Sequence, residues 1–126
     1  MAKITITVGD ETFDATLDQG SAPETVRAIL DALPIEGRAN TWGDEIYFEI
    51  PVETPLENGV ETVSKGDLGY WPQGNAFCIF YGRTPMSKNE EEIVPASAVN
   101  PIGTIEDPET LKGHSDGEPV RIEAAD

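Results

Sequence analysis

The chain has 126 residues, with 24 acidic and 8 basic side chains, a formal net charge of −16, one Cys and one His. A chain of this length can bury a core without a disulfide or a metal, so residues 1–126 are expected to form a single domain. The negative charge argues against nucleic acids and anionic membranes as partners. No apolar run resembles a signal peptide or a membrane span, so the expected compartment is the cytoplasm.

The first third of the chain predicts a hairpin followed by a helix. Apolar and polar residues alternate over residues 4–8 and 13–17, on either side of a Gly-Asp turn, as in two half-buried antiparallel strands. Ser21 and Glu24 have the spacing of a capping box, which predicts that a helix begins there. Pro34 should end this helix at about residue 32 or 33. The apolar stripe of the helix is formed by Val26, Ile29, Leu30 and Leu33.

The rest of the chain consists of short, mostly apolar runs separated by Gly, Pro, Asn and Asp. Residues 76–81 are apolar on both faces and predict a central strand, and residues 82–95 predict a long polar loop. Pro101 should lie at a bulge or a sheet edge, and Asp107-Pro108 should start one helical turn. About eight strands around one helix, without βαβ alternation, predict a mainly β closed barrel or sandwich. The strands are expected within residues 4–8, 13–17, 38–42, 45–50, 60–63, 68–71, 76–81, 98–105 and 120–122.

The acidic side chains are spread along the chain and are not gathered in a tail. Self-repulsion at this density would destabilise a compact chain in ordinary salt, whereas at molar salt the Debye length falls to about 3 Å and the repulsion is screened. The charge therefore favours adaptation to a saline cytoplasm. The alternative is a surface that steers a basic partner, which usually concentrates the charge in one patch.

Few residues indicate catalysis or metal binding. One Cys and one His give no recognisable spacing of transition-metal ligands, and the acids form no calcium-loop pattern, so neither a metal nor another cofactor is expected. His114-Ser115-Asp116 contains the residue types of a catalytic triad, but neighbouring side chains point apart, and the segment is interpreted as a solvated turn. Cys78 lies between two apolar residues of a predicted strand and is interpreted as an inert core side chain.

Most aromatic residues fall in two stretches, residues 40–48 and 69–77. Phe48 and Phe80 are expected to fill the barrel. Trp42 and Trp71 lie beside Gly and Pro at strand ends with polar neighbours, a position that suits the rim of an apolar pocket with a few fixed donors. The alternative is that these two rings also fill the barrel.

The segments NTWGDEIYF, GDLGYWPQGNAFCIFYGRTPMS and PASAVNPIG resemble the signature of a family of small prokaryotic proteins of unknown function with a cyclophilin-like fold. The opening hairpin and the helix fit the same family, so the resemblance covers nearly the whole chain. It implies a closed eight-stranded cyclophilin-like β-barrel with one main helix capping an end. This fold agrees with the strands expected from the residues themselves.

True cyclophilins are peptidyl-prolyl isomerases that use an Arg on a barrel strand beside a pocket for the proline ring. Placing residues 48–51 on their Phe-His-Arg strand puts Glu49 near the position of the Arg, which inverts the charge. Placing residues 75–79 on their Ser-Gln-Phe-Phe-Ile strand puts Cys78 at a pocket Phe, and the loop over residues 82–95 has neither their Trp nor their His. Arg38 or Arg83 would have to supply a guanidinium from elsewhere.

The leading hypothesis is a binding module without isomerase activity, whose aromatic-rimmed cleft takes a small molecule or a short peptide. One alternative is a peptidyl-prolyl isomerase with a rearranged active site, and another is an enzyme acting on a small metabolite. The residues expected at the cleft are Trp42, Tyr47, Glu49, Trp71, Gln73, Phe77, Arg83 and Met86.

Overall fold

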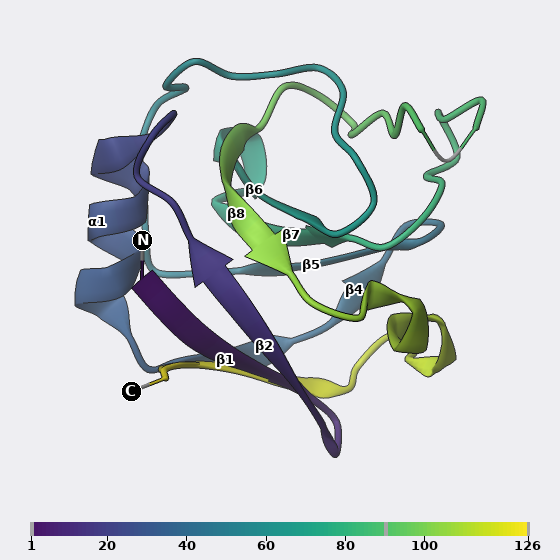
Figure 1. Ribbon diagram of the computed structural model, residues 1–126, viewed down its shortest axis with the longest axis horizontal. Helices are drawn as coiled ribbons and strands as arrows, with labels where there is room; N and C mark the ends of the chain where they lie inside the picture. The colour runs from purple at the N-terminus through teal and green to yellow at the C-terminus, as the bar shows by residue number, and fades with distance from the viewer. Residues whose placement is uncertain (1, 90, 126) are drawn as a thin grey trace.

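The computed structural model describes residues 2–89 and 91–125. Within these residues, nine strands form one antiparallel sheet in the order β3-β9-β1-β2-β8-β6-β7-β5-β4, and the sheet curls into a barrel (Figure 1). The mainly β fold predicted from the sequence is confirmed. The strands are β1 (Ala2–Val8), β2 (Glu11–Leu17), β3 (Ile35–Arg38), β4 (Asn40–Thr41), β5 (Glu45–Glu49), β6 (Asp67–Trp71), β7 (Ala76–Phe80), β8 (Asn100–Ile105) and β9 (Pro119–Ala124).

The barrel is nearly closed. Its edge strands, β3 and β4, follow one another in the chain with only Ala39 between them. Near this seam β3 also packs against β5, because a Cβ atom added at Gly37 would lie 3.1 Å from Cδ2 of Phe48. Nine strands in place of the expected eight is a small difference. Residues 38–42, predicted as one strand, contribute Arg38 to β3 and Asn40 and Thr41 to β4.

The local predictions hold for most strands and fail for one. In the opening hairpin, Ile4 of β1 pairs with Ala15 of β2, which confirms the alternation of apolar and polar residues. The pairing of β6 with β8 shifts register beside Pro101, so the predicted bulge is confirmed. The strand predicted at residues 60–63 is wrong, since this segment makes only two isolated bridges, one from each end. The predicted helical turn is the 3-10 helix Pro108–Gly113.

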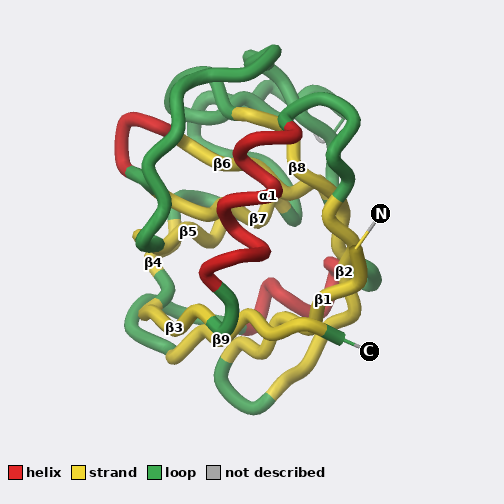
Figure 2. Tube along the Cα trace, turned by 90° about the vertical axis from the view of Figure 1, so that its left-hand side faces the viewer, coloured by secondary structure: helices red, strands yellow, loops and turns green. Residues whose placement is uncertain are grey.

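The helix α1 (Pro23–Ala32) covers one end of the barrel, with the strands arranged around it in Figure 2. Val26 and Ile29 are fully buried and belong to the core inside the barrel, so the apolar stripe covers this end of it. The helix ends at Ala32, as the following Pro34 predicts. No helix in the described part of the chain has the length and the apolar character needed to cross a bilayer.

The start of α1 is stabilised differently from the prediction. The N-cap residue is Ala22, no side chain at this position caps the helix, and the predicted capping box is therefore wrong. The carboxylate of Glu57, from a distant loop, accepts hydrogen bonds from the backbone N–H groups of Glu24 and Thr25, with N–O distances of 3.2 and 2.8 Å. A carboxylate at this end pairs N–H groups that have no partner within the helix and interacts favourably with the helix dipole.

The strand β7 separates two apolar layers, which explains why all five of its residues are buried. Its inner face belongs to the core of the barrel, where Phe77 packs against Phe48 with 5.5 Å between ring centroids. Its outer face carries a second apolar cluster that the segments over residues 60–63 and 93–99 cover. Phe80 lies in this outer cluster, so the expectation that it fills the barrel is wrong, whereas that for Phe48 is confirmed. The outer cluster contains Val63, Ala76, Cys78, Phe80, Ile93 and Val99.

Candidate functional site

A cavity of about 120 Å³ opens at the margin of the outer cluster, between the β4–β5 hairpin, the end of β6 and the segment that precedes β8. Its walls are mostly apolar and aromatic, and they include one carboxyl side chain. We call this cavity the aromatic pocket. The described residues that line it are Trp42, Glu45, Tyr47, Trp71, Pro95, Ala96 and Val99.

The β4–β5 hairpin provides three of these side chains because of its tight turn. The backbone N–H of Trp42 donates to the carbonyl oxygen of Glu45 at 2.9 Å, so the two residues lie opposite one another. Residues opposite one another in an antiparallel pair share a face, and Tyr47, two residues further along β5, lies on that face as well. Gly43 in the turn has a φ of 63°, and an added Cβ atom would lie 2.7 Å from the carbonyl oxygen of Arg83. The turn therefore requires glycine twice, for its backbone angle and for the close approach of the next loop.

Trp71, at the end of β6, forms the facing wall. Its ring meets the ring of Tyr47 edge to face, with 6.3 Å between centroids and an interplanar angle of 80°. Its indole Nε1–H donates to the hydroxyl of Ser97 at 2.5 Å. Because Ser97 belongs to the same segment as Pro95 and Val99, this hydrogen bond fixes the ring against the third wall of the pocket.

Among the described residues, Glu45 is the one whose side chain has a buried polar atom without a hydrogen-bond partner. The residue is 5% exposed, and its Oε1 atom is buried without a hydrogen-bond partner in the described part of the chain. Burial raises the pKa of its carboxyl to about 7, an effect that a smaller interaction with the Cys78 thiol opposes. Near neutral pH the empty pocket therefore holds this carboxyl as a mixture of its protonated and ionised forms.

Sequence reasoning missed Glu45. In a chain with 24 acidic residues, one more Glu at the start of a strand carries no distinguishing signal of its own. The hairpin pattern does indicate where Glu45 lies. Strand alternation puts Glu45 on the same face as Tyr47, and the Gly-Asp turn puts it opposite Trp42. A carboxyl so placed is surrounded by aromatic rings if the outer face of the strand is covered.

Three of the eight residues predicted for the cleft, Trp42, Tyr47 and Trp71, line the aromatic pocket together. Phe77 does not, because it points into the barrel and is fully buried there. The other four are exposed and lie outside the described lining of the pocket; they are Glu49, Gln73, Arg83 and Met86.

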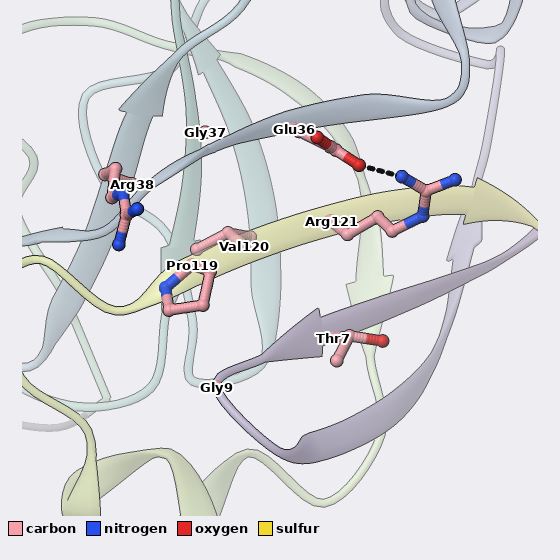
Figure 3. Close-up of a pocket in the computed structure, with 8 residues that line it drawn as sticks. All are labelled: Thr7, Gly9, Glu36, Gly37, Arg38, Pro119, Val120 and Arg121. Atoms are coloured by element: carbon pink, nitrogen blue, oxygen red, sulfur yellow. Dashed lines mark hydrogen bonds and ion pairs between the residues drawn. The ribbon is translucent and has the colours of Figure 1, made fainter.

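Neither Arg considered as a source of a guanidinium lines the aromatic pocket. Arg83 is exposed, and its Nη2 lies 3.4 Å from the carbonyl oxygen of Ser87. Arg38 borders a larger, open depression of about 470 Å³ on the outer face of β3, β9 and β1, shown in Figure 3. In this depression Arg121 pairs with Glu36, and Arg38 donates to the carbonyl oxygen of Gly117 at 3.0 Å. These charged groups already have partners within the protein, and the depression is far more open than the aromatic pocket.

In the segment interpreted as a solvated turn, Ser115 and Asp116 are exposed as expected, but His114 is not. The imidazole of His114 is mostly buried and bridges two carboxylates, with Nδ1 2.8 Å from Glu118 Oε1 and Nε2 2.9 Å from Glu11 Oε1. Burial opposes the charged imidazolium, but the hydrogen bonds to Glu118 and Glu11 outweigh it and raise the pKa of His114. Asp116 instead accepts from the backbone N–H and the hydroxyl of Thr41. The three neighbouring side chains therefore diverge, and the cluster joins loops to the β1–β2 hairpin.

Two further sequence interpretations concern nucleophiles and metals. The thiol of Cys78 is 1% exposed, and burial raises its pKa well above the ordinary value, so it remains a protonated core side chain. Within residues 2–89 and 91–125, no group of His, Cys, Asp and Glu side chains is arranged to hold a metal ion. The chemistry available at the aromatic pocket is therefore that of three rings and one carboxyl.

Comparisons with known proteins agree with this fold. The family model described as cyclophilin-like matches residues 2–123. The solution structure of the hypothetical protein AF2241 from Archaeoglobus fulgidus is similar, with 47% identical residues and a TM-score of 0.83, covering 98% of this chain and 95% of that chain. A search of curated proteins finds no match. The chain thus belongs to the cyclophilin-like family.

Proposed function

We propose that this protein is a binding module without isomerase activity, and that the aromatic pocket takes the end of a small molecule or one side chain of a short peptide. The observation that carries the proposal is the convergence of Trp42 and Tyr47, from the β4–β5 hairpin, and Trp71, from the end of β6, on one small cavity. Ligand sites are typically concave and mostly apolar, with a few fixed polar groups. Here one buried carboxyl among the rings fits that description.

The position of the pocket supports the same proposal. The pairing with true cyclophilins puts Cys78 at a Phe of their proline pocket, and Cys78 pairs across the sheet with Tyr47 of the aromatic pocket. The aromatic pocket thus occupies the side of the barrel where those enzymes bind their substrates. The catalytic guanidinium that the resemblance implies has no counterpart, because no described residue of the pocket lining is basic.

Protein-observed NMR tests the proposal directly. The chain has two Trp residues, and both line the pocket, so the two indole N–H signals report on it alone. In a screen of small soluble fragments, those that bind should shift both indole signals. Trp71→Leu should abolish their binding. The control Leu56→Ala, which changes an exposed side chain in another loop, should leave their binding intact. Fragments that bind without moving the indole signals, or whose affinity survives Trp71→Leu, would refute the assignment of the pocket.

A protease-coupled assay on a proline-containing peptide tests the second half of the proposal. In this assay only the trans isomer is cleaved, so an isomerase accelerates the slow phase. We expect no acceleration. Acceleration that disappears in Arg83→Ala or Arg38→Ala would overturn the proposal and establish an isomerase with a rearranged site.

A further inference from the structure

We propose that the group bound in the aromatic pocket is an organic ammonium cation, held by the carboxylate of Glu45 and enclosed by the rings of Trp42, Tyr47 and Trp71. This inference rests on the proposed function and adds the chemical class of the ligand. It follows from three features of the pocket: its rings, its unpaired carboxyl and the charge around it.

The rings are the first feature. The faces of Trp and Tyr rings carry negative electrostatic potential, and they attract ammonium groups most strongly where water is excluded. Three such residues, from the β4–β5 turn, β5 and the end of β6, surround a cavity of about 120 Å³. The edge-to-face contact of Tyr47 with Trp71, 6.3 Å between centroids, holds two of the rings at nearly a right angle, as the walls of a cage require.

The carboxyl of Glu45 is the second feature. Its Oε1 atom is buried and has no hydrogen-bond partner in the described part of the chain. A buried polar atom without a partner is costly, and it persists where a ligand supplies the partner. A neutral apolar ligand would leave Oε1 unpaired. An ammonium group would supply an opposite charge, and, if it carries N–H, a donor.

The charge around Glu45 is the third feature, and it selects a cation over an anion. The titratable groups that interact with Glu45 are Cys78 on β7 and Tyr81 just after it. Burial keeps both neutral near pH 8, since it raises the pKa of Tyr81 to about 12 and that of Cys78 well above its ordinary value. Asp44 and Asp116 add negative potential at Tyr81. Lys112 lies beside Asp44, 3.9 Å from Nζ to Oδ2, and is not part of the described pocket lining.

Ligand binding should release a proton. The pKa of Glu45 is about 7, so roughly a tenth of the empty pockets hold the carboxylate at pH 6 and roughly nine tenths at pH 8. A cation that requires the carboxylate binds in proportion to this fraction. Its apparent affinity should therefore rise by about tenfold between pH 6 and pH 8.

Two isosteric probes separate charge from shape: choline, and 3,3-dimethylbutan-1-ol, in which carbon replaces the ammonium nitrogen. Their binding is followed by the fluorescence of the two Trp residues, both in the pocket, at constant ionic strength. At pH 8, choline should bind more tightly than the alcohol. The affinity of choline should be about tenfold lower at pH 6 than at pH 8. Glu45→Gln should weaken the preference and remove the pH dependence, whereas Glu61→Gln, an equal charge change at an exposed position, should preserve both.

The outcomes distinguish this inference from the function on which it rests. Equal or tighter binding of the alcohol, or unchanged choline binding in a folded Glu45→Gln variant, would overturn the inference and leave the pocket as a neutral binding site. If neither probe changes the fluorescence or the melting temperature, the inference is overturned, and the proposed function is decided separately by the fragment screen on the indole signals. Calorimetry on the unmodified protein gives an independent test: at pH 7, in two buffers of different ionisation enthalpy, choline should release about half a proton. Release of no proton would also overturn the inference.

An ammonium group can belong to a free amine or to a lysine side chain. Comparison of n-butylammonium with the peptide acetyl-Gly-Lys-Gly-amide distinguishes these sources, because both present the same cation on the same alkyl chain. Tighter binding of the peptide would support the inference with a lysine as occupant. Equal or weaker binding of the peptide would support it with a free amine, and binding of neither, together with no binding of choline, would overturn it.

Discussion

Replacing Glu45 by Gln should stabilise the fold at pH 8 and leave its stability at pH 4 almost unchanged. In the folded protein the pKa of this carboxyl is about 7, above the ordinary value of 4.5, because burial disfavours the charged form. A carboxyl with a raised pKa binds its proton more tightly in the folded chain than in the unfolded chain. Its contribution to stability is therefore complete below pH 4.5 and is lost as the pH rises through 7.

The size of this effect follows from the two pKa values. Each pH unit between them corresponds to about 1.4 kcal/mol, so ionisation of Glu45 lowers the free energy of unfolding by about 3 kcal/mol at most above pH 8. Gln has nearly the same shape and stays neutral at every pH, so it avoids this loss. The free energy of unfolding of Glu45→Gln should exceed that of the unmodified protein by about 2–3 kcal/mol at pH 8 and by less than about 1 kcal/mol at pH 5.

Urea denaturation followed by circular dichroism at pH 5, 6, 7 and 8, in constant KCl, measures this difference. Glu61→Gln serves as the matched control, because it removes the same charge from an exposed position. Its difference from the unmodified protein should stay nearly constant over this range. A constant difference for Glu45→Gln as well would show that Glu45 ionises normally in the fold, and the electrostatic reasoning about the aromatic pocket would be refuted.

Three further changes test other parts of the structure. His114→Gln should destabilise the fold at pH 6 more than at pH 9 in denaturation curves, because the raised pKa of His114 means that its charged form stabilises the fold at low pH and this contribution disappears as the pH rises. Asn100→Leu should lower the free energy of unfolding by about 1–3 kcal/mol in urea titrations, because this buried side chain donates to Thr25 Oγ1 and to the Pro55 carbonyl, both at 3.0 Å, and accepts from Glu57 N–H. The melting temperature of the unmodified chain should rise from low salt to about 2 M KCl, because salt screens the repulsion implied by the charge of −16.

Each of these expectations has an opposite outcome. An equal loss at pH 6 and pH 9 would show that His114 is uncharged between its two carboxylates. A neutral effect of Asn100→Leu would show that its partners pair elsewhere after the change. An unchanged melting temperature in KCl would remove the reason for assigning the protein to a saline environment.

The architecture follows from local sequence patterns, because strand alternation and turn residues act over a few positions. The opening hairpin, the end of α1 and the doubly buried β7 are all predicted in this way. Contacts between distant segments are not. Ser21 and Glu24 satisfy the local pattern of a capping box, yet Glu57 occupies the helix N-terminus, and nothing in its own neighbourhood indicates that role.

The aromatic pocket shows the same limit. The sequence identifies Trp42 and Trp71 as unusual because both lie beside turn residues, and these two rings do meet at one cavity. The sequence does not identify Glu45 and misplaces Phe80, because their burial depends on the segment over residues 93–99 folding back over the outer face of the sheet. A strand pattern specifies which residues share a face, but the covering loop determines whether that face is exposed to solvent or buried.

The covering loop also decides what the outer face of β5 can bind. This strand presents Glu45, Tyr47 and Glu49 on one face, where the resemblance to true cyclophilins implies an Arg. A guanidinium there would donate to a neutral peptide carbonyl, whereas carboxylates repel the electron-rich oxygen and attract a cation. Glu49 is exposed and solvated, so its charge acts weakly, but Glu45 lies under the loop, where the low dielectric strengthens its interactions. The inversion of charge at Glu49 and the buried carboxyl of Glu45 therefore both support the proposal of a cationic ligand.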